Sequence, residues 1–198
     1  MTMIFRKYII LTVLLLTFIG GFGQTFDFVK VIAGKGIVFN NDSILLFKTS
    51  INKTCEILRV KDISDNGDFR MSEWDGYDPE TLEMTGGTKW IKEVRFKNIV
   101  CEFSSDSDIK KLELRWIRIG VDKSMKIYTD NGFEMGEINP NILELFPKVS
   151  KHDFISDDLK TYNLYTYGVS FGLEKLENND LRMIEISTHY RIGNENGL

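Results

Sequence analysis

Short segments of alternating apolar and polar residues constrain the fold of this chain more than any other feature. Successive side chains of a strand point to opposite faces of a sheet, so a period of two predicts strands with one buried face. Because polar turns separate these segments, we expect antiparallel pairing between them. The six segments are residues 90–96, 99–103, 112–119, 162–167, 169–173 and 181–188.

A hairpin and a short helix are predicted ahead of each set of three strands. The hairpins are residues 37–39 with 44–46 and residues 126–128 with 133–135, and polar turns connect their strands. Each helix has an apolar stripe at positions i, i+4 and i+7, and Ser50 is the expected N-cap of the first helix. The stripes consist of Ile51, Cys55 and Leu58, and of Ile138, Ile142 and Leu145.

This repeated order predicts an α+β fold made of two degenerate repeats, with helices packed on antiparallel sheet. The expected divisions are a signal peptide at residues 1–23, a first repeat at residues 24–119 and a second repeat at residues 120–198. The first repeat contains an acidic insertion at residues 62–83 that has no counterpart in the second.

The N-terminus is typical of an export signal. Arg6 and Lys7 precede an apolar run at residues 8–19, and small residues around Gly23 offer a cleavage site. This run is shorter than the roughly twenty residues that a spanning helix needs, so cleavage is favoured over an uncleaved anchor. We expect a periplasmic or secreted protein with no stable membrane insertion after cleavage.

Charge is concentrated in one part of the chain. The formal net charge is −4, and residues 62–83 hold eight acidic residues against the single base Arg70, a local net charge of −7. A general nucleic-acid-binding protein needs clustered Lys and Arg instead. We therefore expect a protein partner with a basic surface and no nucleic acid.

The acidic insertion contains a candidate binding loop at residues 74–80. Large aromatic rings supply buried area at an interface, while carboxylates steer a basic partner. The alternative is a charged surface loop whose tryptophan folds back onto the sheet. The candidate partner-binding residues are Trp74, Asp75, Tyr77, Asp78 and Glu80.

The same insertion partly matches the oxygen-ligand spacing of a calcium loop, in which Gly67 would take the sharp turn. Arg70 at the ninth position and the absence of a predicted exiting helix argue against calcium and favour a solvated turn. No other cofactor is indicated. The candidate ligands are Asp62, Ser64, Asn66, Asp68 and Glu73.

Cys55 and Cys101 are candidates for a disulfide. Cys55 lies on the apolar helix stripe, and Cys101 shares a strand face with Ile99 and Phe103, so both side chains should enter the space between helix and sheet. A bridge would close a loop of about 46 residues and contribute about 3–4 kcal/mol. The alternative is two buried thiols that pack as small apolar residues.

Enzymatic motifs are absent from the sequence. There is no G-x-S-x-G, H-E-x-x-H, C-x-x-C or phosphate-binding loop. We interpret His152 as a solvated loop residue and His189 as a solvated strand-end residue, without a catalytic role. The sequence therefore favours a non-enzymatic protein.

The duplicated hairpin, helix and strand order resembles, in layout, the tandem modules of β-lactamase inhibitory protein and of BamE-like envelope proteins. That resemblance implies a sheet face or loop that holds another protein. We expect an exported inhibitor or immunity-type protein that binds a basic partner through the acidic loop. The alternatives are a cell-envelope assembly factor and a calcium-binding structural module.

Overall fold

The computed structural model describes residues 26–61, 70–77, 84–106, 108–147, 150 and 152–191, and for residues 70–77 and 84–88 the description covers the backbone. The predicted signal peptide lies outside these residues. The described chain forms two sheets, and the smaller one has the strand order β3-β2-β1-β8. Its strands are β1 (Asp27–Ile32), β2 (Gly36–Phe39), β3 (Asp42–Leu45) and β8 (Met125–Thr129).

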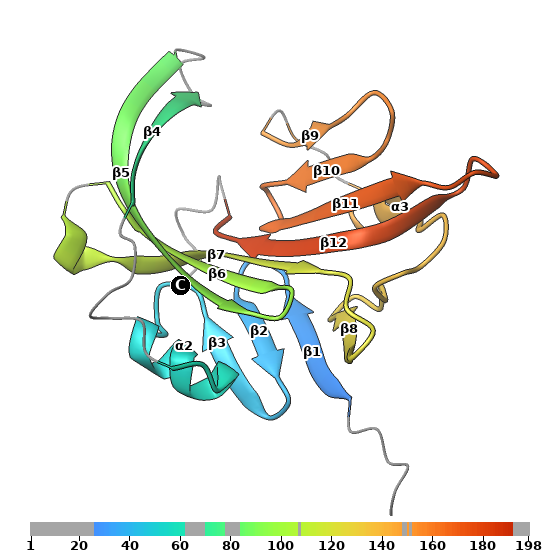
Figure 1. Cartoon of the computed structure of the whole chain (residues 1–198). Coiled ribbons are helices and arrows are strands. Elements are labelled where there is room, and N and C mark those ends of the chain that lie inside the picture. Colours follow the sequence, from blue (N-terminus) through green and yellow to red (C-terminus); the bar gives the residue numbers. More distant parts are fainter. Residues whose placement is uncertain are drawn as a thin grey trace, which may run out of the picture.

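The larger sheet has eight strands in the order β4-β5-β6-β7-β12-β11-β10-β9. Two antiparallel meanders, β4 to β7 and β9 to β12, meet where β7 pairs with β12 (Figure 1). The first meander consists of β4 (Arg70–Tyr77), β5 (Met84–Phe96), β6 (Ile99–Ser105) and β7 (Glu113–Gly120). The second consists of β9 (Phe154–Ile155), β10 (Thr161–Leu164), β11 (Val169–Lys175) and β12 (Leu181–His189).

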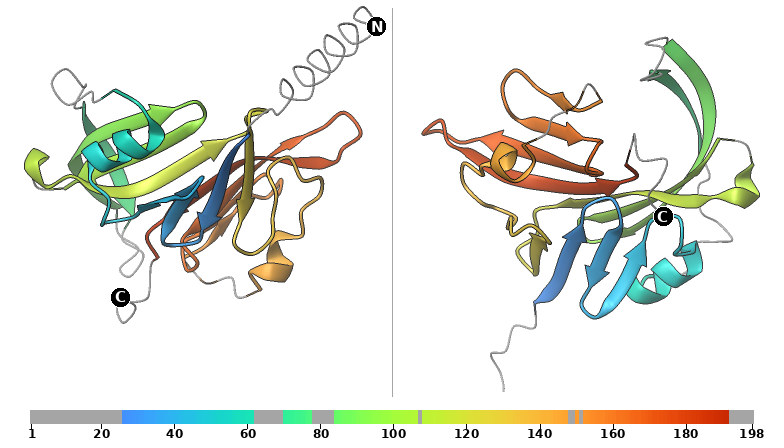
Figure 2. Two further views of the ribbon diagram at one scale, coloured as in Figure 1. Left: turned by 90° about the horizontal axis from the view of Figure 1, so that it is seen from below. Right: turned by 180° about the vertical axis from the view of Figure 1, so that it is seen from behind.

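Helices are few and short in the described residues. They are α2 (Ile51–Leu58), the 3₁₀ helix η1 (Ile109–Lys111) and α3 (Ile142–Leu145). Ser50 caps α2 as predicted, because its side chain accepts a hydrogen bond from the backbone N–H of Lys53 at 3.3 Å. Figure 2 shows α2 beside β3 and the edge of the small sheet.

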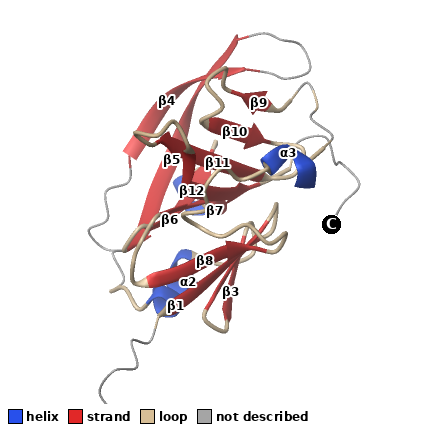
Figure 3. Ribbon diagram, turned by 90° about the vertical axis from the view of Figure 1, so that its right-hand side faces the viewer, coloured by secondary structure: helices blue, strands red, loops and turns tan. Residues whose placement is uncertain are grey.

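One hydrophobic core lies between the two sheets, which Figure 3 shows packed one above the other. Alternate residues of β6 and β7 enter this core, so the opposite face of the large sheet points away from the small sheet. We call that opposite face the open face. Fully buried core residues include Val29, Val31, Ile37, Ile99, Cys101, Phe103, Ile117 and Ile119.

The expected α+β fold of helices packed on sheet in repeats is wrong, because the described structure is mostly β. The predicted second helix is reduced to the four residues of α3. Asn139 adopts a left-handed backbone with φ of 50°, and Pro140 follows it, so the helix begins late. Of the predicted stripe only Ile142 is buried, while Ile138 and Leu145 are exposed.

The second predicted hairpin forms in part. Residues 126–128 lie in β8, which pairs in parallel with β1. The following segment turns back along β8, because the backbone N–H of Thr129 donates to the oxygen of Phe133 and that of Met135 donates to the oxygen of Ile127. The first hairpin, α2 and five of the six predicted strands are confirmed. The remaining one, predicted at residues 162–167, is β10, which ends at Leu164 and is followed by a turn at residues 165–168. The division at residue 119 stays a prediction, although core residues from both predicted halves belong to one cluster.

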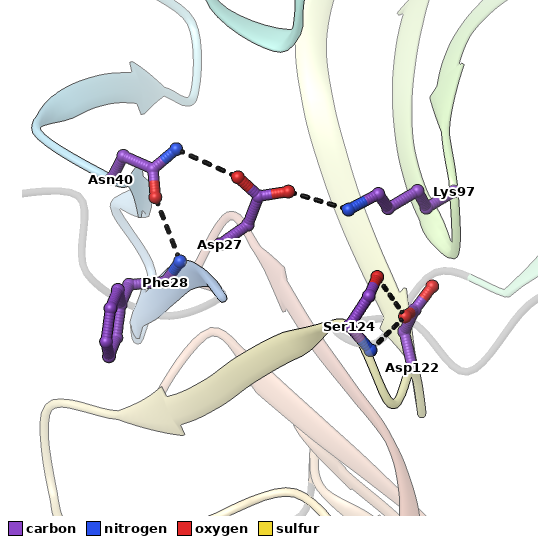
Figure 4. Close-up of polar contacts among 6 residues, drawn as sticks. All are labelled: Asp27, Phe28, Asn40, Lys97, Asp122 and Ser124. Atoms are coloured by element: carbon purple, nitrogen blue, oxygen red, sulfur yellow. Dashed lines mark hydrogen bonds and ion pairs between the residues drawn. The ribbon is translucent and has the colours of Figure 1, made fainter. Parts of the chain in front are cut away.

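A polar cluster joins the turns at one end of the two sheets (Figure 4). Lys97, in the turn between β5 and β6, lies with Nζ 2.6 Å from Oδ2 of Asp27 at the start of β1. The hydrogen bond from Lys97 lowers the pKa of Asp27, which burial opposes. Asp122 accepts hydrogen bonds from the backbone and hydroxyl of Ser124, and these lower its pKa too.

No helix within the described ranges has both the length and the apolar character needed to cross a bilayer.

Candidate functional site

The register of the large sheet brings polar side chains together on the open face. Asn163 of β10 pairs with Ser170 of β11, which in turn pairs with Ser187 of β12. In the next row, His189 pairs with Trp116 of β7. Since paired residues share a face of the sheet, these five side chains form one patch at the joint between the two meanders.

A hollow of about 420 Å³ lies over this patch. Gly172 also lines it, and a Cβ at that position would lie only 3.2 Å from the Cβ of Glu185. Figure 1 shows β4 with β5 and β9 with β10 rising on opposite sides of the central strands of the large sheet. The polar, charged and indole side chains that line the hollow are those of Trp116, Asp158, Lys160, Thr161, Asn163, Ser170, Glu185 and Ser187.

Ser170 and His189 form a hydrogen-bonded pair at the edge of the hollow. Ser170 Oγ lies 3.0 Å from His189 Nε2, and His189 Nδ1 lies 2.9 Å from the backbone oxygen of Tyr190. A carbonyl oxygen can only accept, so the neutral ring carries its proton on Nδ1 and donates it to Tyr190. Nε2 is then the acceptor of the Ser170 hydroxyl. In this arrangement the Tyr190 carbonyl orients the His189 imidazole, and the imidazole can act as a base that accepts the proton of the Ser170 hydroxyl.

Burial is the main influence on the charge of His189. The residue is fully buried, and burial lowers the pKa of its imidazole below 6.5. The backbone oxygens of Tyr190 and Val169 and the carboxylate of Asp153 act in the opposite direction. The ring is therefore predominantly neutral at pH 7, as a proton acceptor must be.

Two aromatic rings enclose the imidazole. The ring centroid of Trp116 lies 4.7 Å from that of His189, and the ring of Tyr165 lies 5.0 Å away. Burial is also the main cause that raises the pKa of Tyr165. Within the described ranges, Ser170 is the side chain that shares a hydrogen bond with this imidazole, and it also lines the hollow.

The expectation that His189 is a solvated strand-end residue is wrong. His189 ends β12, but the rings of Trp116 and Tyr165 cover it. His152 lies in a turn before β9, as predicted. However, it is half-buried and its Nδ1 is buried without a hydrogen-bond partner among the described residues, so it is not the solvated residue expected. The sequence did not single out Ser170, and its alternation with Val169 and Phe171 indicates only that it faces away from the core.

The candidate binding loop is in part a strand. Trp74, Asp75 and Tyr77 belong to β4, where they pair with Gly87, Gly86 and Met84 of β5. Clustered acidic residues and Gly76 favoured a loop in the sequence, but β5 extends over thirteen residues and supplies a partner strand. Asp78 and Glu80 lie outside the described residues.

The calcium hypothesis stays a prediction. Asp62, Ser64, Asn66 and Asp68 lie outside the described residues, and Glu73 belongs to β4. In the part of the chain that the structure describes, no group of three or more His, Cys, Asp or Glu residues is placed to hold a metal ion.

Cys55 and Cys101 are both buried and belong to the same core cluster. The structure holds them as thiols. Burial, and secondarily the neighbouring Cys55, raise the pKa of Cys101 from 9.0 to about 12. The placement of both sulfurs in the core agrees with the sequence analysis, while the disulfide stays a prediction.

Comparisons with protein-family models, curated proteins and solved structures find no match to this chain. The sites are therefore interpreted from their own geometry and chemistry.

Proposed function

We propose that this protein is an exported binding protein that holds a basic protein partner along the β4 edge of its large sheet. The observation that carries the proposal is the position of β4. It is eight residues long, lies at the end of the strand order and, among the described strands, pairs only with β5. The outer main-chain groups of such a strand can pair with a strand of another protein.

The charge of the same segment supports a basic partner. Asp75 and Glu73 belong to β4, and residues 62–83 as a whole carry the local charge of −7. A concentrated negative field accelerates association with positively charged surfaces and weakens as salt increases. Trp74 and Tyr77 add aromatic residues of the kind that dominate interface energies.

An inhibitor or immunity-type role uses these features without further chemistry, because blocking another protein needs only a complementary surface. An envelope assembly factor would use the same strand edge through its main chain. The two roles differ in whether the acidic side chains are required for binding.

The test compares partner capture by residues 24–198 with capture by a variant carrying Asp75→Asn, Asp78→Asn and Glu80→Gln. A matched control carries Asp130→Asn, Glu144→Gln and Glu177→Gln, three exposed acids outside residues 62–83. We expect the unaltered chain and the control to retain one basic protein from the native periplasm or medium at physiological salt. The variant with Asp75, Asp78 and Glu80 replaced should lose this protein. Binding by the unaltered chain should weaken with added salt.

Equal capture by all three proteins would exclude the acidic residues as the determinant of binding and favour the assembly role. Capture of no basic protein by any of them would contradict the proposal.

A further inference from the structure

The Ser170 and His189 pair lies on the open face, away from the β4 edge on which the binding proposal rests. Its two hydrogen bonds are aligned in one direction, from the Ser170 hydroxyl to Nε2 and from Nδ1 to the Tyr190 carbonyl. A hydrogen bond that only stabilises the fold does not have to lie beside a cavity. Here the serine lines a hollow of about 420 Å³, large enough for a small molecule.

We propose that Ser170 is a nucleophile that accepts the acyl group of a small carboxylic ester bound in this hollow, with His189 as its base.

The proposed step balances within the pair and the ester. Ser170 Oγ attacks the carbonyl carbon and forms a new C–O bond, while its proton passes to His189 Nε2. The tetrahedral intermediate then collapses, the bond to the leaving oxygen breaks, and Nε2 returns the proton to that oxygen. The products are an alcohol and an acyl ester of Ser170. Water activated by the same imidazole can release the acid and restore the serine.

The register gives Ser170 a neighbour suited to the charge that develops on the carbonyl oxygen. Asn163 is directly opposite Ser170 on β10, and it also lines the hollow. Opposite side chains in an antiparallel pair have Cβ atoms about 5 Å apart. The amide of Asn163 carries two N–H donors, which is the chemistry used to stabilise an oxyanion. Ser187 lies opposite Ser170 on the other side and provides a hydroxyl.

The walls of the hollow indicate which esters fit. The indole of Trp116 offers an apolar surface, while Thr161, Glu185 and the ion pair of Asp158 with Lys160 offer polar and charged atoms. Short esters with a polar acyl or alcohol group match this mixture. Long acyl chains do not, because they would exceed a hollow of this volume.

The experiment uses the full mature chain, residues 24–198, with p-nitrophenyl acetate and with a small alkyl fluorophosphonate. We expect a burst of one p-nitrophenolate per protein, and mass spectrometry should locate the acetyl or phosphonyl group on Ser170. Ser170→Ala should abolish the burst and the adduct. Ser43→Ala is the matched control, because it removes an exposed hydroxyl of β3 outside the hollow and leaves the pair with His189 intact. This control should react like the unaltered chain.

His189→Gln should lower the acylation rate about 100-fold or more, the range that general-base assistance supplies. Because such a substitution in a buried site can disturb folding, the pH profile of the unaltered chain is the second readout. Burial lowers the pKa of His189, so the rate should fall only as the pH drops through a midpoint below 6.5. Modification elsewhere, an undiminished burst in Ser170→Ala, failure of both probes to modify Ser170, or a midpoint above pH 8 would each overturn the proposal.

Discussion

The imidazole of His189 makes the stability of the protein depend on pH. Its pKa is near 6.5 in an unfolded chain, and burial lowers it in the folded state. Above pH 6.5 the ring is neutral in both states. As the pH falls below 6.5 the unfolded chain takes up the proton first, so the free energy of unfolding decreases. This loss is complete below the pKa of the folded state.

We therefore expect the unfolding temperature to fall between pH 6.5 and pH 5, and to fall less in His189→Gln. The lowered pKa values of Asp27 and Asp122 do not interfere, because stabilisation from these carboxylates is lost only below their ordinary value of 3.8. Ser187→Ala, which keeps the imidazole, serves as the control for thermal unfolding scans. Identical pH dependence in all three proteins would show that His189 does not account for the effect.

The contacts between single residues in the candidate site were harder to predict from the sequence than the strands that carry them. Ser170 and His189 are nineteen positions apart, and they meet because Ser187 pairs with Ser170 while His189 is the next residue on the same face. The pairing includes an irregularity between Gly172 and Leu173. Alternation in a sequence reveals which face a residue takes, but it does not reveal the register of two strands.

Among the elements, α2 and β6 each bring one cysteine into the core. We expect the folded, reduced protein to react with a thiol reagent at pH 8 on the order of a thousand times more slowly than the protein in denaturant, because the buried Cys101 thiol does not ionise. The measurement is a thiol titration with and without urea, and Cys55→Ala isolates Cys101. Rapid labelling in native buffer would contradict this expectation.

The same titration decides the disulfide prediction. Protein recovered from an oxidising compartment should show no thiols in denaturant if the bridge is present, and two if it is not. Because the thiolate attacks in disulfide exchange, the raised pKa of Cys101 slows formation of a bridge in the folded protein and favours its formation before α2 and β6 pack together.

Elements with strong local signals were predicted correctly, and those that depend on distant partners were not. Ser50 and the apolar stripe after it identified α2, and alternation identified the strands on either side of the β7 and β12 joint. In contrast, the sequence predicts a loop at residues 74–80, which overlap β4, because acidic residues and glycine are unusual in a strand. The pairing of β4 with β5 outweighs that local preference.

For the whole molecule, the continuous core predicts cooperative unfolding. Ile117 lies at the joint of the two meanders and is fully buried. Ile117→Ala should lower the free energy of unfolding by about 2–4 kcal/mol, whereas Val121→Ala, at an exposed position, should change it by less than about 0.5 kcal/mol. Denaturant unfolding followed by fluorescence and by circular dichroism measures both. Two separate transitions would instead support independent halves.

The predicted fold class was wrong because segments with similar sequence patterns have different pairing partners in the two sheets. The first predicted hairpin forms β2 and β3. In the second, residues 133–135 turn back along β8, but only β8 becomes a strand of a sheet, where it pairs in parallel with β1. Parallel pairing joins segments far apart in the sequence, and nothing in residues 126–135 alone indicates it.

The place of β12 in the large sheet also sets an order of events for the newly made chain. This strand sits between β7 and β11 at the centre of the sheet, yet it follows every other described strand in the sequence. Until β12 has been synthesised, the two meanders have no shared border. A chain with this topology completes its large sheet only through contacts between segments far apart in the sequence, which slows folding.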